Sequence, residues 1–116
     1  FHAIWFGEKS GKFAVRYGKL SEHGDPIGQV LDLPDARAEH ADIISKGNTI
    51  VVAWRSFDGD KTTIRSIISR DNGNSFHQAV SASTHQENDY PKLIEIGGHF
   101  YLLWRTESKI NSYEIR

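Results

Sequence analysis

The chain has 116 residues, of which 38% are hydrophobic and 25% charged, and its formal net charge is −1. These values are typical of a single globular domain and exclude binding to nucleic acid or anionic membrane through a large net positive charge. Cysteine is absent, which excludes disulfides and thiolate metal sites, and no apolar run approaches the roughly 20 residues of a membrane span.

The distribution of apolar residues predicts an all-β protein. Short runs rich in Val, Ile, Tyr, Phe and Trp alternate with turns that contain Gly, Asn, Asp and Ser, without helical periodicity. The connections KGN, DGD, DNGN and GG supply residues that tolerate positive φ, as hairpin turns require. In chain order, we expect strands at 2–7, 12–20, 28–33, 41–46, 49–57, 62–70, 76–82, 91–96, 99–106 and 109–115.

The sequence also contains an internal repeat. Trp5, Trp54 and Trp104 are 49 and 50 residues apart, and Gly47 and Gly97 each lie seven positions before a tryptophan. A period of about 50 residues filled by four short strands is typical of a β-propeller blade. The alternative is a single β-sandwich in which the tryptophan spacing is a coincidence. Further pairs at the same offset are Ile43 and Leu93, Ile44 and Ile94, and Arg55 and Arg105.

We therefore predict a partial β-propeller of four-stranded antiparallel blades, with about two and a half to three blades in one domain. Residues 1–33 form a blade without its inner strand, 41–83 a complete blade, and 90–116 a blade without its outer strand. Such a partial ring exposes apolar sheet faces to water. We expect either a homo-oligomer, in which a dimer completes six blades, or further blades in a longer propeller.

The segment SRDNGNSF (69–76) predicts a tightly bonded hairpin turn. Asn72-Gly73 suits a type I′ turn, because both central residues of that turn need positive φ. Asp71 can accept hydrogen bonds from turn amides, Ser69 can close further local bonds, and Phe76 can pack between sheets. The expected role of this segment is structural.

This segment resembles the Asp-box (BNR-repeat) motif of sialidase-superfamily propellers, Ser-x-Asp-x-Gly-x-Thr-Trp. Ser69, Asp71 and Gly73 match the motif, while Ser75 and Phe76 replace its Thr and Trp. Residues 41–76 and 89–106 look like the last blades of bacterial exo-sialidase-like proteins. The resemblance implies a six-bladed fold and a periplasmic or secreted bacterial protein.

In an up-and-down blade, the Asp box marks one face, and a ligand site is expected on the other, the mouth face. That face would be built from the loops at 7–11, 34–40, 56–61, 84–90 and 106–109. Sialidases grip a sugar carboxylate with three arginines, attack with a tyrosine activated by a glutamate, and use an aspartate as acid/base. The residue types that fit here are Arg37, Arg55 and Arg105 for ligand binding, with Glu39 and His40 beside them, and Tyr90, Glu87 and Asp89 as catalytic candidates.

These candidates match no sialidase catalytic motif closely, and the Arg-Ile-Pro motif of the first sialidase blade is absent. Arg55 and Arg105 could equally form surface ion pairs with Asp58 or Glu107. We therefore expect a non-catalytic module that binds a glycan or small polar ligand, with an exo-α-sialidase-type hydrolase and a structural or protein-interaction propeller as alternatives. The six histidines show no metal-binding spacing, and we expect no cofactor.

Overall fold

The structure, a computed structural model, describes residues 1–9, 11–84, 88–107 and 109–116. These residues form ten β-strands and no helix, which confirms the all-β prediction. The strands are β1 (His2–Lys9), β2 (Lys12–Leu20), β3 (Pro26–Asp32), β4 (Ala38–Lys46), β5 (Thr49–Phe57), β6 (Thr62–Ser69), β7 (His77–Thr84), β8 (Asn88–Ile96), β9 (His99–Thr106) and β10 (Ile110–Ile115).

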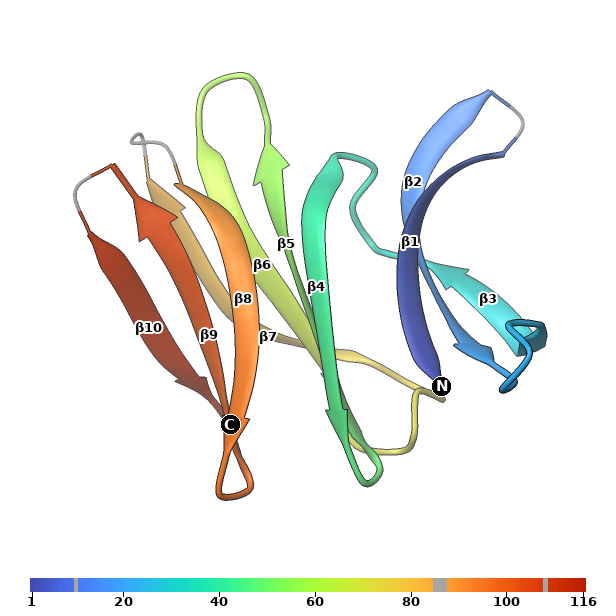
Figure 1. The fold of residues 1–116 in the computed structure, drawn as a ribbon. Coiled ribbons are helices and arrows are strands. Elements are labelled where there is room, and N and C mark those ends of the chain that lie inside the picture. Colours follow the sequence, from blue (N-terminus) through green and yellow to red (C-terminus); the bar gives the residue numbers. More distant parts are fainter. Residues whose placement is uncertain (10, 85–87, 108) are drawn as a thin grey trace.

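The strands form three separate antiparallel sheets, and in each sheet consecutive strands are neighbours (Figure 1). The first sheet contains β1, β2 and β3, the second contains β4 to β7, and the third contains β8, β9 and β10. The repeated tryptophans lie on β1, β5 and β9. The cross-strand register repeats as well, since Trp5 faces Arg16 and Trp54 faces Arg65.

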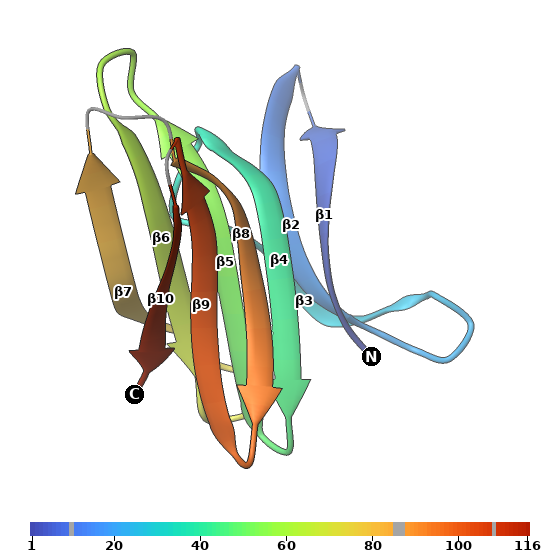
Figure 2. The same cartoon turned by 60° about the vertical axis from the view of Figure 1, so that its left-hand side comes forward.

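The second sheet lies between the other two and is packed on both faces (Figures 1 and 2). Side chains alternate along β5, so Val51 and Ala53 face the third sheet, while Val52 and Trp54 face the first. All four are fully buried. A strand buried on both faces needs a continuous apolar run, which the sequence IVVAW supplies.

The third sheet leaves apolar side chains on its other face. Leu93 is buried against the second sheet, whereas its neighbours along β8, Ile94 and Ile96, are 38% and 61% exposed. Ile110 on β10 is 72% exposed. The closure of this face by other blades stays a prediction. No helical segment in the described part of the chain has the length and hydropathy of a bilayer span.

The turns are sorted between two ends of the molecule. The β4–β5, β6–β7 and β8–β9 turns lie at one end, shown at the bottom of Figure 1, and the β5–β6 turn lies at the other. The glycines at the first end, including Gly47, Gly73 and Gly97, have positive φ of 60°, 85° and 59°. The sequence motif at 69–76 and the β5–β6 connection therefore lie at opposite ends.

Candidate functional site

The segment 69–76 forms the turn between β6 and β7, and its polar groups bond to one another. The Ser69 hydroxyl donates to Asp71 Oδ1 (2.8 Å) and accepts from the Gly73 amide (2.9 Å). The Asp71 carboxylate also accepts from the Ser75 amide (2.8 Å) and hydroxyl (2.5 Å). Asn72 and Gly73 have φ of 62° and 85°, as a type I′ turn requires. The side chains of Ser69, Asp71 and Ser75 therefore form hydrogen bonds that close the turn.

These bonds hold the pKa of Asp71 at about 2, with the Ser75 hydroxyl as the largest cause, followed by the Ser75 amide and the Ser69 hydroxyl. The turn also packs against the first sheet. Phe76 lies edge-on to Tyr17 of β2, with 5.0 Å between ring centroids. The Tyr17 hydroxyl is bonded in turn to His2 Nδ1 at 2.7 Å. The turn thus connects two sheets.

At the opposite end, β4 and β8 each carry a β-bulge at the same position of the repeat. The pairing register shifts just after Glu39 in β4 and just after Asp89 in β8. The next residues, His40 and Tyr90, have φ of 49° and 55°, an uncommon conformation for residues other than glycine. Because pairing continues past the bulges, both strands begin earlier than predicted, and these four residues lie on strands rather than in loops.

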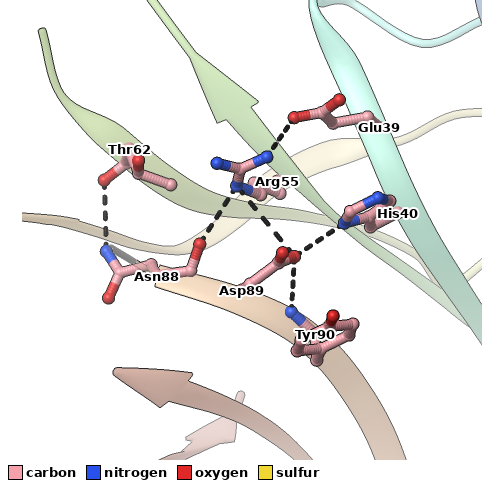
Figure 3. A network of polar contacts seen from close by, with 7 residues as sticks. All are labelled: Glu39, His40, Arg55, Thr62, Asn88, Asp89 and Tyr90. Carbon is pink, nitrogen blue, oxygen red and sulfur yellow. Dashed lines mark hydrogen bonds and ion pairs between the residues drawn. The ribbon is translucent and has the colours of Figure 1, made fainter. Parts of the chain in front are cut away.

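Arg55 on β5 is bound on several sides (Figure 3). Its Nη1 forms an ion pair with Glu39, which lies directly opposite on β4. Its Nε donates to the backbone oxygen of Asn88 at 3.1 Å and lies 4.0 Å from Asp89 Oδ1. The arginine therefore joins the second sheet to the third, and its charge is matched by two carboxylates of the protein itself.

Asp89 is the centre of this network (Figure 3). Its Oδ1 lies 2.7 Å from His40 Nδ1 and accepts from the Tyr90 amide at 2.7 Å. The side chain is only 10% exposed. Burial acts to raise the pKa of Asp89, but the hydrogen bonds from His40 and Tyr90, together with the charges of His40 and Arg55, outweigh it and lower the pKa. Asp89 is therefore an ionised carboxylate that holds the bulge in place.

Arg105 is held differently from Arg55, although both occupy the same position of the repeat. It lies opposite Asp89 on the neighbouring strand, yet Asp89 bonds to His40 and lies beside Arg55. The Arg105 guanidinium carbon lies 5.1 Å from the centre of the Tyr90 ring, and that ring stacks on His40 with an interplanar angle of 5°. Arg105 is exposed, and within the described residues it takes part in no ion pair.

A pocket of about 220 Å³ adjoins this arginine, and its lining comprises Asp89, Arg105, Thr106 and Glu107. Tyr90 is 58% exposed beside Arg105. A guanidinium can bind a carboxylate through two parallel hydrogen bonds, and an exposed aromatic face can carry the apolar side of a small ligand. The Arg105 guanidinium, the Tyr90 ring and the pocket together can bind a small anion that also carries hydroxyl groups.

The other predicted site residues are not gathered here. The Arg37 amide donates to Asp35 Oδ1 at 2.9 Å in the β3–β4 connection, and none of the described contacts brings Arg37 to Arg55 or Arg105. Glu87 lies outside the described residues. The three arginines therefore do not form a common carboxylate grip in the described contacts, and Arg55 is already paired within the protein.

Sequence reasoning missed a second polar cluster, between the first and second sheets. Asp35 Oδ2 accepts from Trp54 Nε1 at 2.8 Å and lies 3.3 Å from Arg65 Nη1. Arg65 lies over the Trp54 ring at 5.4 Å. Burial acts to raise the pKa of Asp35, but the Trp54 hydrogen bond and further donors lower it overall. A lone aspartate in a polar connection gave no signal of this role.

No group of three or more His, Cys, Asp or Glu in the described part of the chain is placed to hold a metal ion. Comparison with known proteins gave no match to this chain among family models, curated proteins or solved structures. The chemistry is therefore inferred from the geometry alone, which offers one exposed arginine beside an aromatic face.

Proposed function

We propose that the protein is a non-catalytic module of the Asp-box propeller type that binds an acidic glycan or a similar small polar ligand. The binding surface is the pocket beside Arg105 and the exposed face of Tyr90, at the end opposite the Asp-box turn. Three stacked meander sheets that share a repeat of about 50 residues support the propeller part of this proposal. Further blades would come from a second copy or from a longer chain.

The binding proposal rests on the surroundings of the Arg105 guanidinium. Its cross-strand neighbour Asp89 bonds to His40 and lies beside Arg55, so the carboxylate nearest in register is engaged elsewhere. The Tyr90 ring lies against the Arg105 guanidinium and reduces the number of conformations it can adopt. An arginine that is positioned in advance loses less entropy when it binds a carboxylate.

The described contacts of Tyr90 support binding rather than hydrolysis. A tyrosine nucleophile needs a base within hydrogen-bonding distance of its hydroxyl. In the described residues, Tyr90 contacts Asp89 through its backbone amide, and its ring stacks on His40. Asp89 interacts with His40, Tyr90 and Arg55, and these contacts stabilise the β-bulge. Among the described residues, which leave out Glu87, the pocket therefore has groups for recognition, and no described contact joins a base to the Tyr90 hydroxyl.

Isothermal titration calorimetry with a methyl sialoside and a neutral methyl galactoside tests the proposal. We expect binding of the acidic sugar only, and Arg105→Gln should weaken it by about tenfold or more, as expected for loss of a charge-assisted hydrogen bond. Arg70→Gln is the matched control, because Arg70 is exposed at the Asp-box end. Equal effects of the two substitutions would refute the proposal. Turnover of a fluorogenic sialoside that Tyr90→Phe abolishes would establish the hydrolase alternative instead.

A further inference from the structure

His40 and Arg105 are linked through two residues of β8. Asp89 Oδ1 lies 2.7 Å from His40 Nδ1, and Asp89 also lies opposite Arg105 in the β8–β9 ladder. The ring of the next residue, Tyr90, is parallel to that of His40 and lies 5.1 Å from the Arg105 guanidinium carbon. Asp89 and Arg105 both line the 220 Å³ pocket. One carboxylate and one aromatic ring therefore separate His40 from the proposed ligand site.

His40 can exchange protons with water. Its side chain is 48% exposed, whereas that of Asp89 is 10% exposed. Histidine is the side chain whose charge ordinarily changes between about pH 5 and pH 8, while arginine stays charged throughout. The Nδ1 proton is present in the charged ring and in one of the two neutral tautomers. Loss of the Nε2 proton thus removes a charge and keeps the hydrogen bond to Asp89.

The charged groups next to His40 lie on three strands. Among the described residues, Glu39 precedes it on β4, and Asp89 on β8 lies between it and Arg55 on β5 (Figure 3). Toward the first sheet, His40 shares a cavity with uncharged side chains, those of Ile4, Trp5, Phe6 and Val15. The first-sheet side chains that line this cavity therefore cannot compensate for a change in the charge of His40.

The charge balance at the pocket depends on His40. Among the described residues, the network and the pocket lining contain two guanidinium groups and three carboxylates, those of Arg55, Arg105, Glu39, Asp89 and Glu107. When His40 is neutral, the carboxylates outnumber the cations, and their field opposes an approaching anion. When His40 is protonated, the numbers are equal. Arg105 then attracts an anion with less competition from Asp89, the carboxylate opposite it.

We propose that protonation of His40 strengthens the binding of an acidic ligand at Arg105, which makes the pocket a pH-responsive site. This inference rests on the proposed function, because it concerns the same pocket. By linkage, an anion that binds at Arg105 favours the protonated form of His40 to the same extent. The ligand is bound more tightly in mild acid and is released as the pH rises.

The expected effect is moderate, because His40 acts on the ligand through Asp89 and Tyr90. A unit charge at this remove, close to a protein surface, should change anion affinity by about three- to tenfold. Salt at about 0.1 M limits such interactions to a range of about 10 Å, so the effect should be largest at low ionic strength.

Isothermal titration calorimetry with a methyl sialoside at about pH 5.5 and about pH 7.5, in about 20 mM salt, tests the inference. The sugar carboxylate is ionised at both values, so a pH dependence arises in the protein. Wild type should bind about three- to tenfold more tightly at the lower pH. His40→Gln keeps a hydrogen-bond donor for Asp89 but cannot gain a charge, so its affinity should change by less than about twofold.

His99→Gln is the matched control. His99 on β9 pairs with the Glu114 carboxylate through Nδ1 at 2.9 Å, as His40 pairs with Asp89. It begins the strand that Arg105 nearly completes, so it lies far from the pocket along β9. This variant should keep the pH dependence of wild type. A pH dependence that persists in His40→Gln, or that His99→Gln removes, would overturn the proposal.

Proton uptake provides a second test, which needs no substitution. Heats of binding at about pH 6.5, in two buffers with different protonation enthalpies, give the number of protons taken up when the sialoside binds. Wild type should take up a fraction of a proton, and proton release or no exchange would overturn the proposal. If the sialoside binds equally at both pH values, this inference fails and the proposed function stands. If it binds at neither, both fail.

Discussion

Tyr17 of β2 and Gly73 of the β6–β7 turn are in such close contact that a Cβ added to Gly73 would lie 2.1 Å from the Tyr17 hydroxyl oxygen. Tyr17 is 2% exposed and belongs to the core between the first and second sheets. Two features therefore require glycine at position 73: its φ of 85° and the close approach of a side chain from another sheet.

Gly73→Ala should lower the free energy of unfolding by at least about 2 kcal/mol, because backbone strain adds to a steric overlap. Urea titration followed by tryptophan fluorescence measures this change. Gly47→Ala is the matched control, since Gly47 has a φ of 60° but no atom within 4 Å of an added Cβ. Its cost should stay near 1 kcal/mol, the usual cost of the left-handed conformation. Equal losses in the two variants would show that the Tyr17 contact is unimportant.

The lowered pKa of Asp71 predicts a stability change in acid. A carboxyl group whose pKa falls on folding stabilises the protein above its unfolded pKa of about 4, and that contribution is lost as the pH falls. Because the folded value is about 2, the loss should occur between about pH 4 and pH 2. Asp71→Asn should be less stable than wild type at pH 6 and approach it near pH 2.

Unfolding free energies measured across this pH range for wild type and Asp71→Asn test the prediction. Asp60→Asn serves as a control, because it removes an exposed carboxylate from the β5–β6 turn at the other end. A difference between wild type and Asp71→Asn that widens on acidification would contradict the assignment of these hydrogen bonds.

Asp35 should matter more for stability than its position in a connection suggests. Asp35→Ala leaves the indole N–H of the buried Trp54 without its acceptor and leaves Arg65 without an opposite charge. We expect a loss of about 2–3 kcal/mol in the free energy of unfolding. The Asp35→Ala, Trp54→Phe double-mutant cycle isolates the hydrogen bond, and a coupling energy of zero would contradict it.

The two carboxylates beside Arg55, those of Asp89 and Glu39, should contribute unequally to the free energy of unfolding. The Asp89 side chain is 10% exposed, whereas that of Glu39 is 42% exposed. Asp89→Ala should therefore cost about 3 kcal/mol, because it leaves a mostly buried cation short of a partner. Glu39→Ala should cost about 0.5 kcal/mol, as for an exposed ion pair. Thermal unfolding of both variants makes the comparison, and the reverse order would refute the described network.

Local patterns accounted for most of the secondary structure. Alternating apolar residues and Asn-Gly or Gly-Gly turns identified all ten strands, and the hydrogen bonds of Ser69 and Asp71 follow from short-range turn chemistry. The largest errors in strand starts were at 38 and 88, which were predicted at 41 and 91. The polar residues before Pro91 looked like a loop, whereas the bulge after Asp89 lets the ladder continue to Asn88.

Tertiary partners were harder to predict. The sequence suggested Asp58 or Glu107 for Arg55, because these residues are near in the chain or in the repeat. Its actual partners are Glu39, across the sheet, and Asp89, from the next sheet. The first depends on strand register and the second on the stacking of sheets, and neither is encoded in a short segment. Likewise, only the three-dimensional arrangement shows that two carboxylates neutralise Arg55, whereas Arg105 has no ion pair within the described residues.

Backbone amide NMR during titration with an acidic sugar tests the central claim most directly. If the exposed arginine beside Tyr90 is the binding site, the largest shift changes should cluster at Tyr90, Arg105 and Thr106 and be absent with the neutral sugar. Shift changes confined to the β6–β7 turn or to β1, or none up to saturating sugar, would contradict the assignment of this surface as a ligand site.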